Sequence, residues 1–354
     1  MLRSLPLLFL IAATSHAQWL NYPTPGIPRT ADGKPNLIAP APRTTDGRPD
    51  LTGLWMLNAG PGNLANITAD LKPGEIQPWA DALFKERLGN VGIDDPWTVK
   101  CLPAGPRIIL SGGNGPAQIV QTPAMLVILY EDLSYRQIFL DGRELPKDPN
   151  PSWMGYSIGH WDGETLVVES TGFNDRSWLD MGGHPHTESL HTTERFHRTS
   201  FGHMDLQVTF TDPKAYARPW TISFGVNFAP DTSILEYVCA ENEKDRKHLV
   251  GRTAAEKKVV VPRVILSQYV GFYETVSGTG TATMSRSFNI TLSGDQLMIE
   301  MGGKGRMPLV PLSQTTFSPR LLGTYEFVKD SRGAVTHMMV YSTEGDLKAI
   351  RKPK

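Results

Sequence analysis

The sequence lacks an excess of charge of either sign. Lys and Arg number 35 against 36 Asp and Glu, which gives a formal net charge of −1. A general nucleic-acid binder needs a basic footprint that displaces counterions from the phosphates, so no nucleic-acid partner is expected. After the N-terminal residues, no stretch approaches 18 unbroken apolar residues. This excludes a bundle of membrane-spanning helices.

Cysteine is scarce as well, because only Cys101 and Cys239 are present. In an oxidising compartment, an even and minimal count predicts one structural disulfide between them. The alternative is a catalytic thiol. Cys239, however, ends a strand-like run from Ile234 and has no flanking motif of known cysteine enzymes. We therefore predict the Cys101–Cys239 disulfide.

The N-terminal residues 1–17 have the features of a cleaved signal peptide. Arg3 supplies a positive charge, residues 5–13 form a short apolar region, and Ser15-His16-Ala17 fits a small-x-small cleavage site. The apolar run is too short to anchor the chain in a bilayer. We expect a mature protein that begins at Gln18 and lies in the periplasm or outside the cell, with no transmembrane segment after cleavage.

Glycine and proline are abundant, with 33 and 28 residues, and 31 aromatic residues can form a core. This composition favours a turn-rich, mostly β fold. Residues 18–50 are predicted to be a Pro-rich extended arm, in which residues 28–37 repeat as residues 42–51. Residues 76–88 carry apolar side chains at helical spacing and predict one short helix, with Pro78 in its first turn.

The pattern of strand, turn and strand fills residues 51–243 and predicts an antiparallel barrel or a sandwich as the main domain. The predicted strands alternate with Asp-Gly and Pro-Asp turns, and the last of them covers residues 233–240. Residues 244–263, charged and then Val-rich, are predicted to be a linker. Residues 264–354 repeat the strand pattern and predict a smaller C-terminal β-barrel.

Two regions resemble known families. The ordered motifs Pro49–Trp55, Gly159–Val168, Thr171–Asn174 and Pro185–Glu188 resemble those of an uncharacterised secreted bacterial family, and this resemblance implies no function. The C-terminal pattern of Tyr269–Tyr273, Pro308-Leu309, Phe317, Glu326-Phe327 and Asp330–Val335 resembles the lipocalin-like barrel appended to serine β-lactamase-type hydrolases. That module is accessory, and the Ser-x-x-Lys motif of its usual partner is absent from this sequence. For the main domain, we expect a barrel that resembles the lipocalin-like superfamily.

Five of the nine histidines fall between residues 184 and 203. Within this group, His184, His186 and Glu188 lie close together around a stiff Pro185 and are candidate ligands of a divalent metal, zinc or iron. No His-Glu-x-x-His or Cys-x-x-Cys pattern accompanies them. The alternative is a polar loop whose imidazoles cap strands or hydrogen-bond to the backbone.

A second candidate site centres on Glu194. If it lies inside the barrel it needs a partner, because an unpaired buried carboxylate is costly, and Arg136 and Arg143 are the candidates. With His160, these residues form the predicted ligand-binding set. His186, Glu188 and Glu194 are candidate catalytic acid–base groups. Alternatively, Glu194 belongs to a purely structural ion pair.

Residues 155–159 match the Gly-x-Ser-x-Gly pattern around Ser157. A nucleophile elbow places a helix after the serine, but a strand is predicted here, so we interpret the motif as a strand start.

Three functions follow from these patterns. The first is a secreted protein that binds a small, partly apolar ligand in a barrel cavity. The second is a metal-dependent or acid–base enzyme, a hydrolase, lyase or isomerase, that uses the His184/His186/Glu188 loop. The third is an envelope protein that docks a partner through the Pro-rich arm and the C-terminal barrel.

Overall fold

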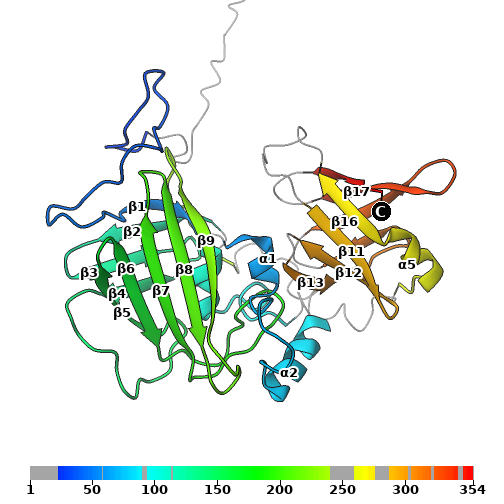
Figure 1. Cartoon of the computed structure of the whole chain (residues 1–354), viewed down its shortest axis with the longest axis horizontal. Coiled ribbons are helices and arrows are strands. Elements are labelled where there is room, and N and C mark those ends of the chain that lie inside the picture. The colour runs from blue at the N-terminus through cyan, green and yellow to red at the C-terminus, as the bar shows by residue number, and fades with distance from the viewer. Residues whose placement is uncertain are drawn as a thin grey trace, which may run out of the picture.

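The computed structural model describes residues 23–57, 59–89, 94–112, 115–239, 259–275, 287–301, 304–319, 323–341 and 346–353. The fold is mostly β, with one closed barrel followed by a second, nearly closed sheet (Figure 1), which confirms the predicted fold class. The predicted signal peptide, residues 1–17, and residues 244–258 of the predicted linker lie outside the described residues.

The first barrel is closed by nine strands in chain order. They are β1 (Gly53–Met56), β2 (Ala117–Gln121), β3 (Met125–Leu129), β4 (Tyr135–Phe139), β5 (Tyr156–Asp162), β6 (Thr165–Thr171), β7 (His191–Arg198), β8 (His203–Thr211) and β9 (Trp220–Phe228). Closure comes from β1, which pairs with β2 on one side and with β9 on the other, where Trp55 lies opposite Phe228. Every neighbouring pair is antiparallel except β4 and β5, which are parallel.

Side-chain alternation fills the interior of this barrel. In β8, Met204, Leu206, Val208 and Phe210 are buried, and the residues between them are more exposed. Their apolar side chains pack with those of the other strands in one core. This is the inside–outside pattern that a strand with one face on a core must have.

Within residues 51–243, two strand assignments differ from the sequence prediction. The short strand β2 was not predicted. The predicted strand over residues 233–240 is wrong for its described part, because residues 232–238 form no strand. The edge of β9 already pairs with β1, so no free edge remains for another strand there. Instead, this segment crosses the surface, where the Tyr237 amide donates to the Glu131 carbonyl. It then reaches the predicted Cys101–Cys239 disulfide, which is confirmed.

The N-terminal arm is described from residue 23 and lies on the barrel. Each copy of its repeat forms a small turn, closed by the bridges Arg29–Pro35 and Arg43–Pro49. The glycines at both tips, Gly33 and Gly47, have φ near +80°, which other residues rarely adopt. In each copy the arginine then forms a bidentate pair with the barrel, Arg29 with Asp231 and Arg43 with Glu164.

Short helices lie beside the barrel. They are α1 (Gly60–Ala65), α2 (Pro78–Gly89), the 3-10 turn η1 (Gly105–Arg107) and α3 (Ile108–Ser111), and α5 (Arg263–Tyr269) precedes the second sheet. The α2 helix is the one predicted over residues 76–88. No helix in the described ranges combines the length and the apolar character that a membrane span requires.

The second sheet has the order β13-β12-β11-β10-β18-β17-β16-β15-β14. Its strands are β10 (Gly271–Thr275), β11 (Ser287–Ser293), β12 (Gln296–Met301), β13 (Lys304–Pro308), β14 (Val310–Pro311), β15 (Thr316–Ser318), β16 (Thr324–Lys329), β17 (Val335–Tyr341) and β18 (Leu347–Arg351). The two edge strands follow each other in the chain, so the sheet curls almost closed. Its core holds the stacked rings of Tyr269 and Phe327. The α1 helix lies between this sheet and the barrel, against β13 (Figure 1).

Candidate ligand-binding cleft

A cavity of about 640 Å³ lies in the wall of the first barrel, between β4, β5 and the segments that flank them. It is lined by Pro103 and by residues 133–137, 139, 143–146 and 152–158. No residue of β6 to β9 lines it. We refer to it as the β4–β5 cleft. It opens through the side of the barrel and does not run along the barrel axis, which the apolar core occupies.

The cleft exists because β4 and β5 pair over a very short length. They are joined in parallel at only two positions, Ile138 with Ser157 and Phe139 with Ile158. Parallel neighbours need a long crossover connection, and residues 140–155 supply it. This segment runs out from the end of β4 and returns to the start of β5. The beginning of β4 is therefore left without a neighbouring strand on that side, and the cleft fills the gap.

A buried ion pair forms the floor of the cleft. Nη2 of Arg136 donates to Oε1 of Glu194 at 2.6 Å, and Nη1 donates to Oε2 at 3.0 Å. Arg136 is only 3% exposed and Glu194 is fully buried. Nη2 also lies 3.3 Å from the Ser170 hydroxyl and 3.5 Å from that of Ser157, and these two hydroxyls are 2.7 Å apart. Of these residues, Arg136 and Ser157 line the cleft.

The charges of this floor are balanced. Burial alone lowers the pKa of Arg136, but the Glu194 carboxylate raises it above its ordinary value, so the pair stays ionised. Burial raises the pKa of the nearby Tyr130 to about 12, which keeps the phenol neutral. The Arg136 guanidinium interacts with this hydroxyl and opposes the rise, but burial has the larger effect.

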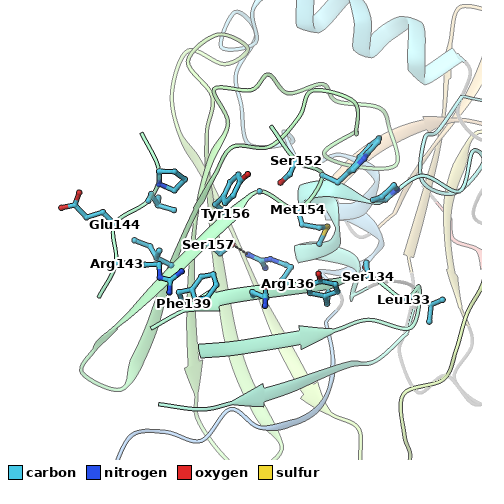
Figure 2. A pocket seen from close by; sticks show the side chains of 18 residues that line it. Leu133, Ser134, Arg136, Phe139, Arg143, Glu144, Ser152, Met154, Tyr156 and Ser157 are labelled. Carbon is cyan, nitrogen blue, oxygen red and sulfur yellow. Dashed lines mark hydrogen bonds between the residues drawn. The ribbon is translucent and has the colours of Figure 1, made fainter. Parts of the chain in front are cut away.

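Apolar and aromatic side chains form the rim of the cleft. Figure 2 shows Tyr156 and Met154 on one side and Phe139 with Arg136 on the other. The guanidinium of Arg143 lies 3.7 Å from the centre of the Phe139 ring, a cation–π contact. Arg143 is not the partner of Glu194, although the sequence left that pairing open. Its Nη2 pairs with Asp141 at 2.6 Å on the surface.

The structure separates the predicted ligand-binding residues. Arg136, Glu194 and Arg143 belong to the cleft or its floor. His160 does not, because it is exposed on β5 and the residues that line the cleft end at Ile158. Glu194 points into the barrel with Thr192 and Phe196, whereas the histidines on the alternate positions of β7 face outward.

Ser157 has a different role from that of a nucleophile elbow. It lies within β5, which continues to Asp162, so no helix follows to supply an oxyanion dipole. The flanking glycines allow close packing: a Cβ on Gly159 would lie 2.8 Å from the Leu140 side chain, and one on Gly155 would lie 2.7 Å from the Thr171 carbonyl. The motif thus fixes a buried hydroxyl at the base of the cleft.

His184 belongs to a buried hydrogen-bonded network away from the cleft. Its Nδ1 lies 2.6 Å from Oδ2 of Asp180, and its Nε2 lies 2.8 Å from the Thr68 hydroxyl. Its ring stacks on Phe84 of α2 at a centroid distance of 3.7 Å. Burial raises the pKa of Asp180, but its interaction with the His184 ring and hydrogen bonds from backbone amides more than offset this and lower it. The network fastens the loop to α2.

His186 is held separately. Its Nε2 lies 2.8 Å from the Ser177 hydroxyl, and its Nδ1 lies 3.3 Å from the Thr187 carbonyl. Burial lowers the pKa of His186 to about 4, so the ring is neutral at pH 7. In this state Nδ1–H donates to the carbonyl and Nε2 accepts from Ser177.

The predicted metal ligands are not brought together. Both ring nitrogens of His184 and of His186 already have neighbouring partners, and the Glu188 side chain is exposed. Within the described ranges, no group of three or more His, Cys, Asp or Glu side chains is placed to hold a metal ion. The reason is local: Asp180 and Ser177 lie in the same loop and bind the imidazoles.

Sequence reasoning missed Met154 and Tyr156 of the rim, and Tyr130 and Ser170 beside the ion pair below it. Ser170 had a signal, because it follows Leu166 and Val168 at alternate positions of β6 and is therefore directed inward. The aromatic rim had none, because it forms only where the crossover segment returns beside β4. No family model matches this chain, and no curated protein is similar to it in sequence at a significant level.

Proposed function

We propose that this protein binds a small, partly apolar ligand in the β4–β5 cleft. The observation that carries the proposal is the pairing of an apolar, aromatic rim with a buried, charge-balanced polar floor in a cavity of about 640 Å³. Binding sites for small molecules are commonly concave and mostly apolar, with a few fixed polar groups that orient the ligand.

The ion pair itself also supports a role in ligand binding. Removing two charges from water costs several kcal/mol per ion, and a buried pair is often no better for stability than apolar side chains of similar volume. The pair of Arg136 and Glu194 lies under the cleft, where Arg136 is part of the wall. A polar group retained at such a position is well placed to orient a ligand.

The geometry gives less support to the second function, and it does not bear on the third. For an acid–base enzyme, Glu194 is already bound by two N–H groups of Arg136, and His186 is enclosed. The docking of an envelope partner through the arm remains a prediction. We also propose that the protein is secreted to the periplasm or beyond, and a disulfide is compatible with such a compartment.

Binding of the neutral, apolar dye Nile red tests the proposal. We expect its fluorescence to rise on titration with the protein. The Phe139→Ala variant, which removes a ring from the rim, is expected to weaken binding at least fivefold. Phe272→Ala is the matched control, because Phe272 is an exposed ring on β10 of the second sheet. Equal binding by both variants and the unchanged protein would reject the cleft as the site.

A further inference from the structure

The backbone of β4, as well as its side chains, has groups that can form hydrogen bonds. Its hydrogen bonds to β3 alternate, as in any antiparallel ladder. Just beyond the strand, the Leu140 amide donates to the Ala124 carbonyl at 2.8 Å. Counting back by twos along the same register, Ile138 and Arg136 are the residues whose amides and carbonyls face β3.

Tyr135 and Gln137 therefore direct their backbone groups to the opposite side, toward the cleft. The strand β5 pairs with β4 only at Ile138 and Phe139. In the described part of the chain, no hydrogen bond outside the sheet ladders reaches the Tyr135 carbonyl or the Gln137 amide. Both residues line the cavity. The cleft thus presents one carbonyl acceptor and one amide donor along a short length of strand edge.

An acceptor and a donor spaced two residues apart are what a neighbouring strand would pair with. An extended peptide segment that lies opposite Arg136 can donate an N–H to the Tyr135 carbonyl and accept from the Gln137 amide through a C=O. Addition of such a segment to a strand edge is a recurrent mode of recognition, in which the backbone supplies affinity and side-chain pockets supply specificity.

The charges in the cleft also restrict which terminal groups the ligand can carry. Both arginines that line it are already paired, Arg136 with Glu194 and Arg143 with Asp141. Glu144 lines it as well and adds a negative charge. A ligand carboxylate would find no uncompensated cation, and it would lie near a carbonyl where the edge needs a donor. An uncharged amide satisfies the same positions.

We propose that the ligand of the β4–β5 cleft is an uncharged, peptide-like amide with an aromatic side chain, held by the free edge of β4. The aromatic group suits the rim of Phe139, Met154 and Tyr156. This inference rests on the proposed function, since it names the class of ligand that the same cleft takes.

Calorimetric titration of the full chain with two probes tests the inference. N-acetylphenylalaninamide is the uncharged probe, and N-acetylphenylalanine carries a carboxylate in place of its terminal amide. We expect the amide to bind and to displace Nile red, and the carboxylate to bind at least tenfold more weakly. Equal or tighter binding of the carboxylate would overturn the inference. Binding of Nile red without binding of the amide would overturn it while leaving the proposed function intact, and binding of neither would remove both.

Substitution at Gln137 isolates the backbone contribution. Gln137→Pro removes the cleft-facing N–H but no hydrogen bond to β3, whereas the control Gln137→Ala keeps the N–H. We expect the proline variant to lose at least tenfold in amide affinity while it retains Nile red, and the alanine variant to retain both. If Gln137→Pro does not fold, the Gln137 amide proton of the unchanged protein is followed by NMR. A downfield shift at saturation supports the inference, and an unchanged resonance overturns it.

Discussion

The two sheets differ sharply in what they bury. The first barrel and its loops enclose two ion pairs, Arg136–Glu194 and Arg107–Asp95, and the hydrogen-bonded pair His184–Asp180, all with almost inaccessible side chains. Among the described residues of the second sheet, no polar or charged side chain is buried to that degree. Its core is apolar and aromatic throughout. Similar strand patterns in the sequence therefore produce two very different interiors.

The difference suggests how the two parts divide their work. An apolar core needs only shape and volume to be satisfied, and it supports stability directly. Burial of an ion pair costs desolvation free energy, and such a pair often contributes little net stability. The second sheet accordingly packs against α1 with an apolar core, whereas the first barrel carries polar groups that suit ligand binding. Three changes break or sharpen this contrast.

Loss of the disulfide should have the largest effect, and it should fall on the first barrel. Cys101 and Cys239 are separated by 138 residues, so in the chain-entropy model their bond contributes about 5 kcal/mol to the free energy of unfolding. All eight tryptophans precede residue 221, so none lies in the second sheet and their fluorescence does not report on it. We expect the Cys101→Ala/Cys239→Ala variant to unfold at much lower urea concentration by this signal. An unchanged midpoint would show that the bond does not support the barrel.

Breaking the ion pair under the cleft should have the next largest effect. Glu194→Leu leaves the Arg136 guanidinium buried without a counterion, which should cost about 3–5 kcal/mol of unfolding free energy. The double variant Arg136→Met/Glu194→Leu replaces both charges with apolar groups and should recover most of that loss. Urea unfolding of the three proteins measures both effects.

The double variant decides whether the pair serves stability or binding. If the double variant is as unstable as Glu194→Leu, the pair supports the fold in its own right. The buried charges of the first barrel would then give no argument for ligand binding. A recovered stability together with weakened binding of N-acetylphenylalaninamide would assign the pair to the cleft.

Acidification should have a smaller effect, again confined to the first barrel. The folded-state pKa of His186, about 4, lies below the ordinary imidazole value of 6.5. The unfolded chain therefore takes up the proton first as the pH falls. This contribution to stability is fully present above pH 6.5 and is lost between pH 6.5 and 4, by about 1.4 kcal/mol per pH unit.

Thermal unfolding as a function of pH measures this loss. We expect His186→Gln, whose amide can still bond to Ser177, to flatten the decline between pH 6.5 and 4. His337 on β17 of the second sheet is the matched position, because burial and Lys348 lower its pKa only moderately. His337→Gln should leave the decline nearly unchanged. The opposite pattern would place the acid-sensitive group in the second sheet.

Much of the fold was predictable from sequence, because it depends on local patterns. Period-two alternation located β7, β8 and β9, and the scarcity of cysteine fixed the disulfide. The strand β2 was missed because it follows a segment without clear periodicity. The false strand at residues 233–240 shows the limit of local pattern, since no free sheet edge remained for it to join.

The site was less predictable, because it depends on distant contacts. The need of Glu194 for a partner followed from elementary electrostatics, but the choice of Arg136 over Arg143 depended on which faces the barrel interior. The metal hypothesis considered His184, His186 and Glu188 without the polar residues that precede them in the loop. Asp180 and Ser177, a few residues earlier, bind both rings. A cleft formed by a crossover segment leaves no periodic signal.

The central claim is that ligand binding belongs to the first barrel, in the β4–β5 cleft. Hydrogen exchange measured by mass spectrometry, with and without saturating Nile red, tests it most directly because it reports on both sheets at once. We predict slower exchange in peptides that cover residues 133–158 and no change in those that cover residues 287–341. Protection that falls on the second sheet, or on neither sheet, would contradict the claim.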